Sequence, residues 1–259
     1  MSWFSAPSGA HAGAQRGGGA AGPIPPKPPI APRPVTPGAP PRPGWPAASP
    51  APPADIRIAD DLFLIAHRDR DGRPLLPARV MGLAIAGAVL CELALVSQIT
   101  VGEGTLVVVS DADPGEELAR WLVRQLLSQP NPLPLRDWLA YLASSVTAAV
   151  GERLARAGTI RARKGLRGWR FAPVDSADAF FRAGRLAVML DNGSPLSTGQ
   201  AALIGLIYAV GLHEQLPSVN PASFRGRVSA VIQSLEWPFA GLIAETAVVV
   251  DNAILTGRT

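Results

Sequence analysis

The sequence predicts a mainly α-helical protein, with one globular helical domain that carries two short β-hairpins and follows a disordered, proline-rich tail. Three observations support this prediction. Residues 1–54 hold 16 of the 27 prolines and no acidic residue. Residues 55–259 contain a series of apolar segments with helical spacing. Two shorter segments are rich in β-forming residues, and each surrounds a turn that contains glycine.

The tail and the domain differ in composition. A segment dominated by proline, glycine and alanine cannot bury enough apolar surface to offset the entropy of ordering, so we predict a disordered tail over residues 1–54. Residues 55–259 are enough for a single hydrophobic core. The tail lacks the continuous apolar stretch of a signal peptide, so we expect a cytoplasmic protein.

The positive charge of the domain is local. The chain has 24 Lys and Arg against 20 Asp and Glu, and the tail supplies four of the cations, which leaves 20 of each sign in residues 55–259. The high isoelectric point therefore does not indicate a basic surface throughout. The densest basic segment runs from Arg153 to Arg170.

The first helices are predicted from their starts and their apolar spacing. A helix opens at Ile58, with Asp60 or Asp61 as the expected N-cap. A polar turn at 69–72 separates it from a helix over 78–96 that is apolar nearly all round, as a central core helix would be.

A β-hairpin is expected over 99–109, around a Gly-Glu-Gly turn. A helix over 116–128 follows, then a proline-rich break. The next helix begins near Leu135 and runs, with an interruption, to Ala157, with Gly158 as the expected C-cap residue.

The second hairpin is predicted over Ile160 to Phe171. Gly165 and Gly168 permit its turn, and Leu166 and Trp169 lie near the tip. Its cations are Arg161, Arg163, Lys164, Arg167 and Arg170.

Four helices complete the domain. The first is amphipathic and covers 176–190; the second starts at the capping-box sequence Ser197–Gln200 and runs to Leu212. The last two are expected over 222–235 and 238–255. The apolar stretches 80–96 and 237–250 are no longer than the roughly 20 residues that span a bilayer, so we expect buried helices there.

No arrangement of residues in the sequence predicts catalysis. His67 with Asp69 and Asp71 matches no metal-ligand spacing and is expected in a solvated turn. Glu92 and Glu245 are expected to be core carboxylates with structural partners. The single cysteine, Cys91, excludes a disulfide within the chain. We therefore expect a protein that is not an enzyme and has no metal or cofactor.

The basic hairpin is the strongest functional signal. Several cations beside Leu166 and Trp169 suit reversible binding to an anionic membrane, in which these two apolar side chains insert and the cations contact lipid phosphates. Arg153 and Arg156, on the preceding helix, are candidate additions to the lipid-binding set.

Two alternatives remain open from the residues alone. A protein-interaction adaptor could use the hairpin or the polyproline-compatible segments Pro25–Pro29 and Pro40–Pro43. A winged-helix nucleic-acid binder would also place a hairpin after a helix, but residues 139–150 carry no charge, so we expect no nucleic-acid partner.

The order of motifs resembles the Golgi phosphoprotein 3 family of peripheral membrane proteins, which has actinobacterial members. The resemblance extends from Ile58 to the C-terminus. It rests on five segments in order: Arg68–Gly72, Glu92–Leu95, Ser110–Gly115, Leu154–Gly158 and Leu206–Ala209, with Trp138 between the third and fourth.

The resemblance implies a mainly helical fold, binding of phosphatidylinositol 4-phosphate, and a membrane-inserting hairpin at Arg161–Phe171. It also implies recognition of the cytoplasmic tails of membrane proteins and self-assembly through that hairpin. The headgroup-binding Trp and Arg positions of the family fall on Pro77, Ala86, Ser144 and Thr147, so its pocket residues are absent here.

Overall fold

A computed structural model describes residues 57–110, 112–165, 168–174, 178–216 and 219–256, and it describes only the backbone of 162–165, 168–170, 173, 178 and 179. The predicted tail, 1–54, and the hairpin residues Leu166 and Arg167 lie outside the described residues. The helices are α1 (Ile58–Ile65), α2 (Ala78–Leu95), α3 (Glu117–Leu127), α4 (Leu135–Leu142), α5 (Val146–Arg156), α6 (Asp178–Asp191), α7 (Thr198–Ala209), α8 (Pro221–Ser234) and α9 (Phe239–Thr256). The strands are β1 (Ile99–Gly102), β2 (Thr105–Val108), β3 (Ile160–Gly165) and β4 (Gly168–Pro173).

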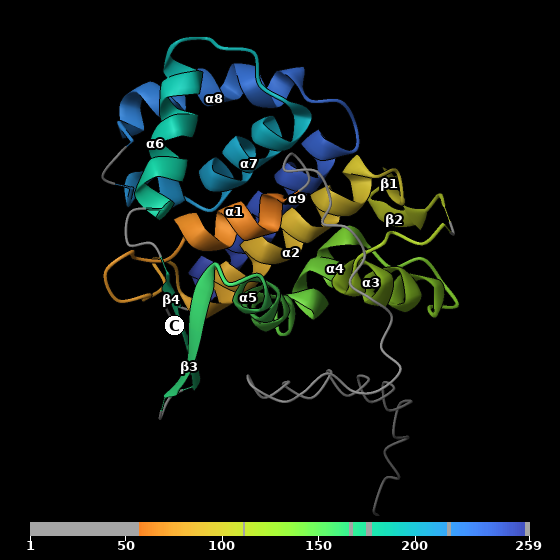
Figure 1. The fold of residues 1–259 in the computed structure, drawn as a ribbon. Coiled ribbons are helices and arrows are strands. Elements are labelled where there is room, and N and C mark those ends of the chain that lie inside the picture. The colour runs from red at the N-terminus through yellow and green to blue at the C-terminus, as the bar shows by residue number, and fades with distance from the viewer. Residues whose placement is uncertain (1–56, 111, 166–167, 175–177, 217–218, 257–259) are drawn as a thin grey trace, which may run out of the picture. The chain divides into compact units, whose positions relative to one another are not determined.

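Helix α2 lies at the centre of the helices, with α1 on one side and α9 on the other (Figure 1). Every residue from Val80 to Ala94 is buried, and the helix also contacts α4, α5 and α7. A helix that is apolar nearly all round has no face suited to water, so its neighbours must cover it on all sides. The predicted mainly helical fold with a central core helix is confirmed.

Helices α2 and α9 are both long and apolar enough, by length and composition, to cross a membrane. In α2, 83% of the residues are buried inside the protein, so this helix forms the core as predicted. In α9 the share is 33%, because only one side of the helix packs against α2, α4 and α7. The expectation that α9 is a buried helix was therefore wrong for most of its surface, and Glu245 is half-exposed.

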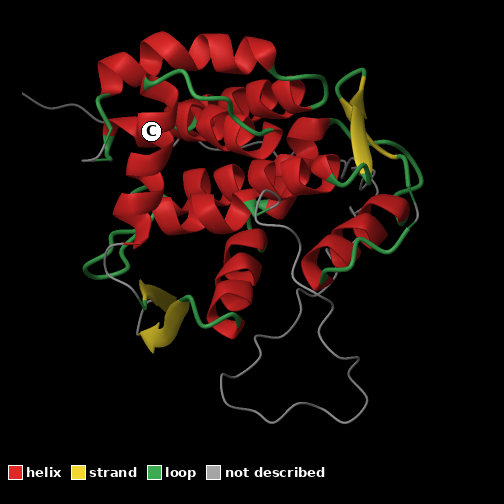
Figure 2. Cartoon of the chain, turned by 45° about the horizontal axis from the view of Figure 1, so that its top comes forward, coloured by secondary structure: helices red, strands yellow, loops and turns green. Residues whose placement is uncertain are grey.

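Each of the two hairpins forms its own two-stranded antiparallel sheet, and they lie on different sides of the helices (Figure 2). In the first, Gly102 pairs with Thr105, and the two turn residues Glu103 and Gly104 have φ angles of 49° and 76°. Positive φ at both positions is the geometry that tight hairpin turns favour, and it explains the glycine. Both predicted hairpins are present.

Several predicted helix ends agree with the structure. The Ser197 hydroxyl accepts the N–H of Gln200, whose side chain accepts the N–H of Ser197, so the capping box of α7 is present. The interruption expected before Ala157 lies between α4 and α5, and Gly158 follows α5 with a φ of 75°. Helix α7 ends at Ala209 and not near Leu212, since Gly211 adopts a left-handed conformation.

The start of α1 differs from the prediction. Its N-cap position is Arg57, and no side chain caps the helix there. Asp60 is buried and Asp61 is half-buried, and each carboxylate binds an arginine from a distant part of the chain. These carboxylates do not cap the helix because they form stronger, charge-assisted hydrogen bonds with the distant arginines in the folded state.

Candidate functional site

The basic hairpin is a two-stranded ribbon that directly follows α5. Its pairs run from Ile160 with Pro173, at the base, to Gly165 with Gly168, at the turn. The base lies against the helices, and the turn end points away from them (Figures 1 and 2). The Gly165–Gly168 end of the two strands therefore lies beyond the packed helices.

Two contacts hold the base of the ribbon. Ile160 is buried, and Phe171 packs its ring edge-on against Phe63 of α1, with centroids 5.4 Å apart. Phe171 also lies over Gly151 of α5, where a Cβ atom would stand 2.7 Å from the ring. The absence of a side chain at Gly151 is thus what lets the aromatic ring sit on the helix.

The strand register separates the hairpin residues into two faces. Arg161 pairs with Ala172 and Arg163 with Arg170, whereas Lys164 pairs with Trp169. Because successive residues alternate between faces of a strand, positions 161, 163 and 170 share one face of the ribbon. Lys164 and Trp169 belong to the other face, together with Phe171. Arg161 is exposed.

The two arginines of α5 have different environments. Arg156 is exposed on the last turn, where its guanidinium lies 3.6 Å from the carboxylate of Glu117. Arg153 is only 7% exposed and points into the protein. This placement does not agree with the prediction that Arg153 contacts lipid, because the Arg153 guanidinium already binds buried carboxylates. Arg153 is therefore not a lipid-contacting residue.

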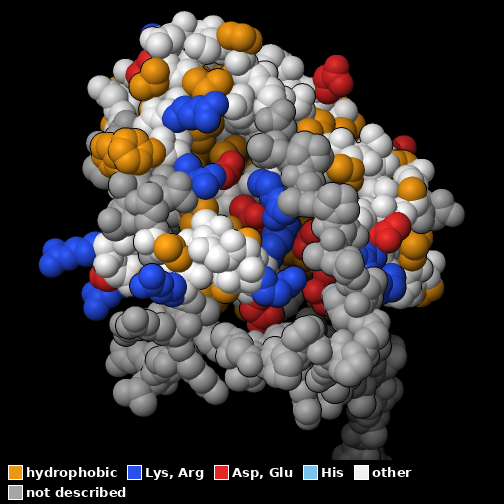
Figure 3. All heavy atoms as spheres, viewed as in Figure 1, with side chains coloured by type: hydrophobic (Ala, Val, Ile, Leu, Met, Phe, Trp, Pro, Cys, Tyr) orange, Lys and Arg blue, Asp and Glu red, His pale blue; other side chains and the backbone are white. Residues whose placement is uncertain are grey.

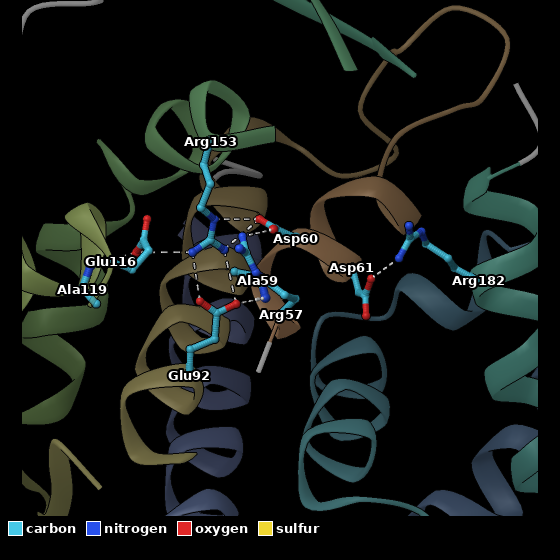
Figure 4. Close-up of polar contacts among 9 residues, drawn as sticks. All are labelled: Arg57, Ala59, Asp60, Asp61, Glu92, Glu116, Ala119, Arg153 and Arg182. Atoms are coloured by element: carbon cyan, nitrogen blue, oxygen red, sulfur yellow. Dashed lines mark hydrogen bonds and ion pairs between the residues drawn. The ribbon is translucent and has the colours of Figure 1, made fainter. Parts of the chain in front are cut away.

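Arg153 is the centre of a buried ionic network (Figure 4). Its Nε donates to Asp60 Oδ1 at 2.8 Å, and its Nη1 lies 3.2 Å from Glu92 Oε2 and 3.5 Å from Glu116 Oε2. The network therefore connects α5, the helix that carries the hairpin, to α1, α2 and the start of α3. Arg57 adds a second cation, 2.9 Å from Asp60.

The network holds three carboxylates and two guanidinium groups. Burial raises the pKa of Glu92 to about 7, and the charge and hydrogen bonds of Arg153 oppose that rise. The N–H of Ala59 also donates to Glu92, at 2.7 Å. Burial disfavours the charged carboxylate and is the main reason that Glu92 holds a proton near neutral pH, and the neighbouring Asp60 carboxylate adds to the rise.

The expectation that His67 lies in a solvated turn was wrong, because its side chain is buried and only 7% exposed. Its ring stacks on Phe63 with centroids 4.2 Å apart, and its Nδ1 lies 2.6 Å from the carbonyl oxygen of Phe63. Burial lowers the pKa of His67. Within the described ranges, no group of three His, Cys, Asp or Glu side chains could hold a metal ion.

The four positions where the resemblance implies headgroup ligands carry no cation. Pro77 and Ser144 are exposed, Thr147 is half-buried, and Ala86 is fully buried in α2. Arg79, near Pro77, is exposed. These four positions therefore supply no positive charge for a lipid headgroup.

A cavity of about 360 Å³ lies between α1, α6 and α7. Its wall includes the ion pair of Asp61 with Arg182 and the side chain of Arg185. Asp60 and Arg57 also line it. Because carboxylates accompany most of its cations, this cavity does not concentrate positive charge.

Sequence reasoning missed the neighbours of the hairpin. The polar turn at 68–73 packs against the backbone of β4, and α6 begins next to it. Phe180 and Phe181, which belong to the apolar pattern of α6, are 48% and 67% exposed. Phe181 lies off the buried face of Ala183, Leu186, Ala187 and Leu190, so a phenylalanine pair at the helix start is the signal that could have marked an exposed aromatic side chain there.

A search of curated proteins finds no significant match to this chain. The family model of Golgi phosphoprotein 3 (GPP34) matches residues 58–243, which include every element from α1 to the start of α9. The matched region covers most of the chain, and we conclude that the chain belongs to the Golgi phosphoprotein 3 family.

Proposed function

We propose that this protein binds reversibly to anionic membranes through the basic hairpin of β3 and β4, without catalysing a reaction. Membership of the family supports a lipid- or protein-binding role in general. The observation that carries the proposal is a ribbon held at its base by Phe171, with its turn end pointing away from the helices and cations along it.

The energies suit reversible binding. A cation close to an anionic membrane surface contributes about 1 kcal/mol. The five cations of the hairpin would together contribute on the order of 5 kcal/mol, which attaches the protein to a membrane but allows its release. Leu166 and Trp169 would add apolar contacts at the level of the headgroups, where tryptophan is favoured.

We expect the protein to respond to membrane charge more than to one headgroup. The resemblance implies binding of phosphatidylinositol 4-phosphate, but the positions that it assigns to the headgroup are Pro77, Ala86, Ser144 and Thr147, none of which can bind a phosphate through a positive charge. Binding of that lipid would then depend on its charge alone. We place the protein in the cytoplasm, at the membrane surface.

Co-sedimentation with vesicles tests the proposal. The protein should sediment with phosphatidylcholine vesicles that contain phosphatidylglycerol, and not with phosphatidylcholine alone. Vesicles with phosphatidylinositol 4-phosphate, matched for total charge, should bind equally well. Stronger binding to the phosphoinositide would indicate a specific headgroup site.

Matched variants locate the contact. Arg163→Ala with Arg170→Ala removes a cross-strand pair of cations, and Trp169→Ala removes the candidate inserting side chain. Arg124→Ala with Arg225→Ala removes two exposed cations from α3 and α8 as a control. The hairpin variants should lose binding and the control should keep it. Binding that ignores lipid charge, or that survives the hairpin variants, would refute the proposal.

A protein-binding role of the same hairpin is the second candidate. Each strand of a two-stranded sheet has one edge that its partner does not cover, and such edges can accept another strand. A second copy of the chain, or the cytoplasmic tail of a membrane protein, could pair there. Light scattering of the protein without vesicles tests the first case: a dimer that Arg163→Ala with Arg170→Ala disrupts would support it.

A further inference from the structure

The turn at residues 68–73 joins the hairpin to the start of α6. Gly72, with a φ of 62°, packs so closely on β4 that a Cβ atom would stand 2.1 Å from the carbonyl oxygen of Phe171. On the other side, the Asp69 carboxylate accepts the N–H of Phe180, in the first turn of α6, at 3.2 Å. The turn, β4 and α6 therefore form one continuous surface.

This surface carries exposed cations. Arg68, Arg70 and Arg73 are all exposed. The two carboxylates of the turn bind nearby groups: Asp69 accepts the N–H of Phe180 in α6, and Asp71 lies 3.3 Å from Arg73. Among the described residues, Arg68 and Arg70 have no ion-pair partner.

Next to these cations lies an exposed aromatic pair. Phe180 and Phe181 are 48% and 67% exposed, and their rings contact each other edge-on with centroids 6.1 Å apart. Val174, which directly follows β4, is 50% exposed. Figure 3 shows hydrophobic side chains and Lys and Arg side chains close together on this face.

The core does not account for the two phenylalanines. The buried face of α6 consists of Ala183, Leu186, Ala187 and Leu190. A single exposed apolar side chain is ordinary, but two adjacent phenylalanines beside exposed arginines combine the two features that bind an anionic interface.

We propose that the Arg68–Arg73 turn and Phe180–Phe181 form a second membrane-contacting element beside the hairpin. The occupant of this surface is an anionic bilayer: its phosphates bind Arg68 and Arg70, and its headgroup region takes up the two phenyl rings. The inference rests on the proposed function, since it extends the same membrane contact along the protein.

A second contact would fix the orientation of the protein on the membrane. A single contact lets the body rotate above the membrane, whereas two contacts joined by the 68–73 turn fix one face toward it. Once the hairpin binds, the phenylalanines are held near the bilayer at a high effective concentration, so each contact strengthens the other.

An environment-sensitive label tests the second contact directly. Phe181→Cys introduces an exposed thiol for a nitrobenzoxadiazole dye, and the natural Cys91 is fully buried. Val109→Cys is the control, because Val109 is 54% exposed just after β2, on a different side of the helices (Figure 2). On phosphatidylglycerol vesicles, the label at position 181 should brighten and shift to the blue, and the label at 109 should not.

A matched pair of variants gives the energetic test. Phe180→Ser with Phe181→Ser should weaken vesicle binding by about tenfold or more, as expected for partly exposed aromatic rings that lose an apolar environment. Val107→Ser with Val109→Ser, also exposed and apolar, should leave binding unchanged.

The outcomes separate the two proposals. If the unmodified protein sediments with anionic vesicles but the label at 181 stays unchanged and the phenylalanine variant binds normally, the second contact is refuted and the hairpin remains. If the unmodified protein does not sediment at all, the proposed function fails and the second contact fails with it.

Discussion

The guanidinium of Arg153 binds the carboxylate of Asp60 through two nitrogens, Nε at 2.8 Å and Nη2 at 2.7 Å. The two residues are 93 positions apart in the sequence and lie on α5 and α1. This contact, with Glu92 on α2, attaches the helix that precedes the basic hairpin to the core. The network is thus a structural support for the candidate site and not a part of its surface.

Removing Arg153 should destabilise the protein strongly. Arg153→Leu leaves the buried carboxylates of Asp60 and Glu92 without their main cation, which typically costs about 3–5 kcal/mol in the free energy of unfolding. Urea denaturation measures this loss. Arg156→Leu is the matched control: the side chain of Arg156 is 61% exposed, and its loss should cost less than about 1 kcal/mol. Equal losses for the two variants would contradict the central role of Arg153.

The raised pKa of Glu92 predicts a pH dependence of stability. The folded protein holds a proton on Glu92 up to about pH 7, whereas the unfolded chain releases it near the ordinary value of 4.5. Stability from this proton is fully present below 4.5 and is lost as the pH rises through about 7.

The variant Glu92→Gln isolates this effect. Between these two pH values the free energy of unfolding of the natural protein should fall, relative to that of the variant, by about 1 kcal/mol per pH unit. Denaturation at several pH values measures both slopes. Glu245→Gln, on the half-exposed side of α9, should keep the slope of the natural protein. Parallel slopes for the natural protein and Glu92→Gln would exclude the assignment.

A methyl group at position 151 should disturb the hairpin base. In Gly151→Ala the new Cβ would stand 2.7 Å from the ring of Phe171, so the ring and β4 must shift, at a cost of about 1–3 kcal/mol. Gly226→Ala in α8 meets nothing within 4 Å and should stabilise its helix by up to about 1 kcal/mol. Thermal unfolding compares the two. A neutral Gly151→Ala would mean that Phe171 does not hold the hairpin.

Salt should remove the contribution of the hairpin cations. In low salt, loss of Arg163 and Arg170 should weaken vesicle binding by about 2 kcal/mol, because each cation contributes about 1 kcal/mol near an anionic leaflet. Since salt screens exposed charges, the natural protein and the double variant should bind with similar, low affinity in high salt. Titration with vesicles at both salt concentrations measures this convergence. A constant difference would show that the two arginines act other than by charge.

Much of the fold could be predicted from local patterns. The apolar spacing of α2, the capping box of α7 and the glycine turns of both hairpins depend on neighbouring residues, so the sequence was sufficient to place them. The same holds for the cations of the hairpin, which follow one another along the chain. The exposed side of α9 could not be predicted, since its apolar composition resembles that of the buried α2.

The sequence by itself determined where helices, strands and the cationic segment lie, because these features follow from short-range periodicity and turn chemistry. Only the tertiary structure decided which cations face water. Arg153 and Arg156 are one helical turn apart, yet the first lies among carboxylates from three other elements and the second is exposed. It also brought the Arg68–Arg73 turn and the phenylalanines of α6 beside the hairpin. Contacts between residues far apart in the chain depend on how the helices pack, and no local pattern carries that information.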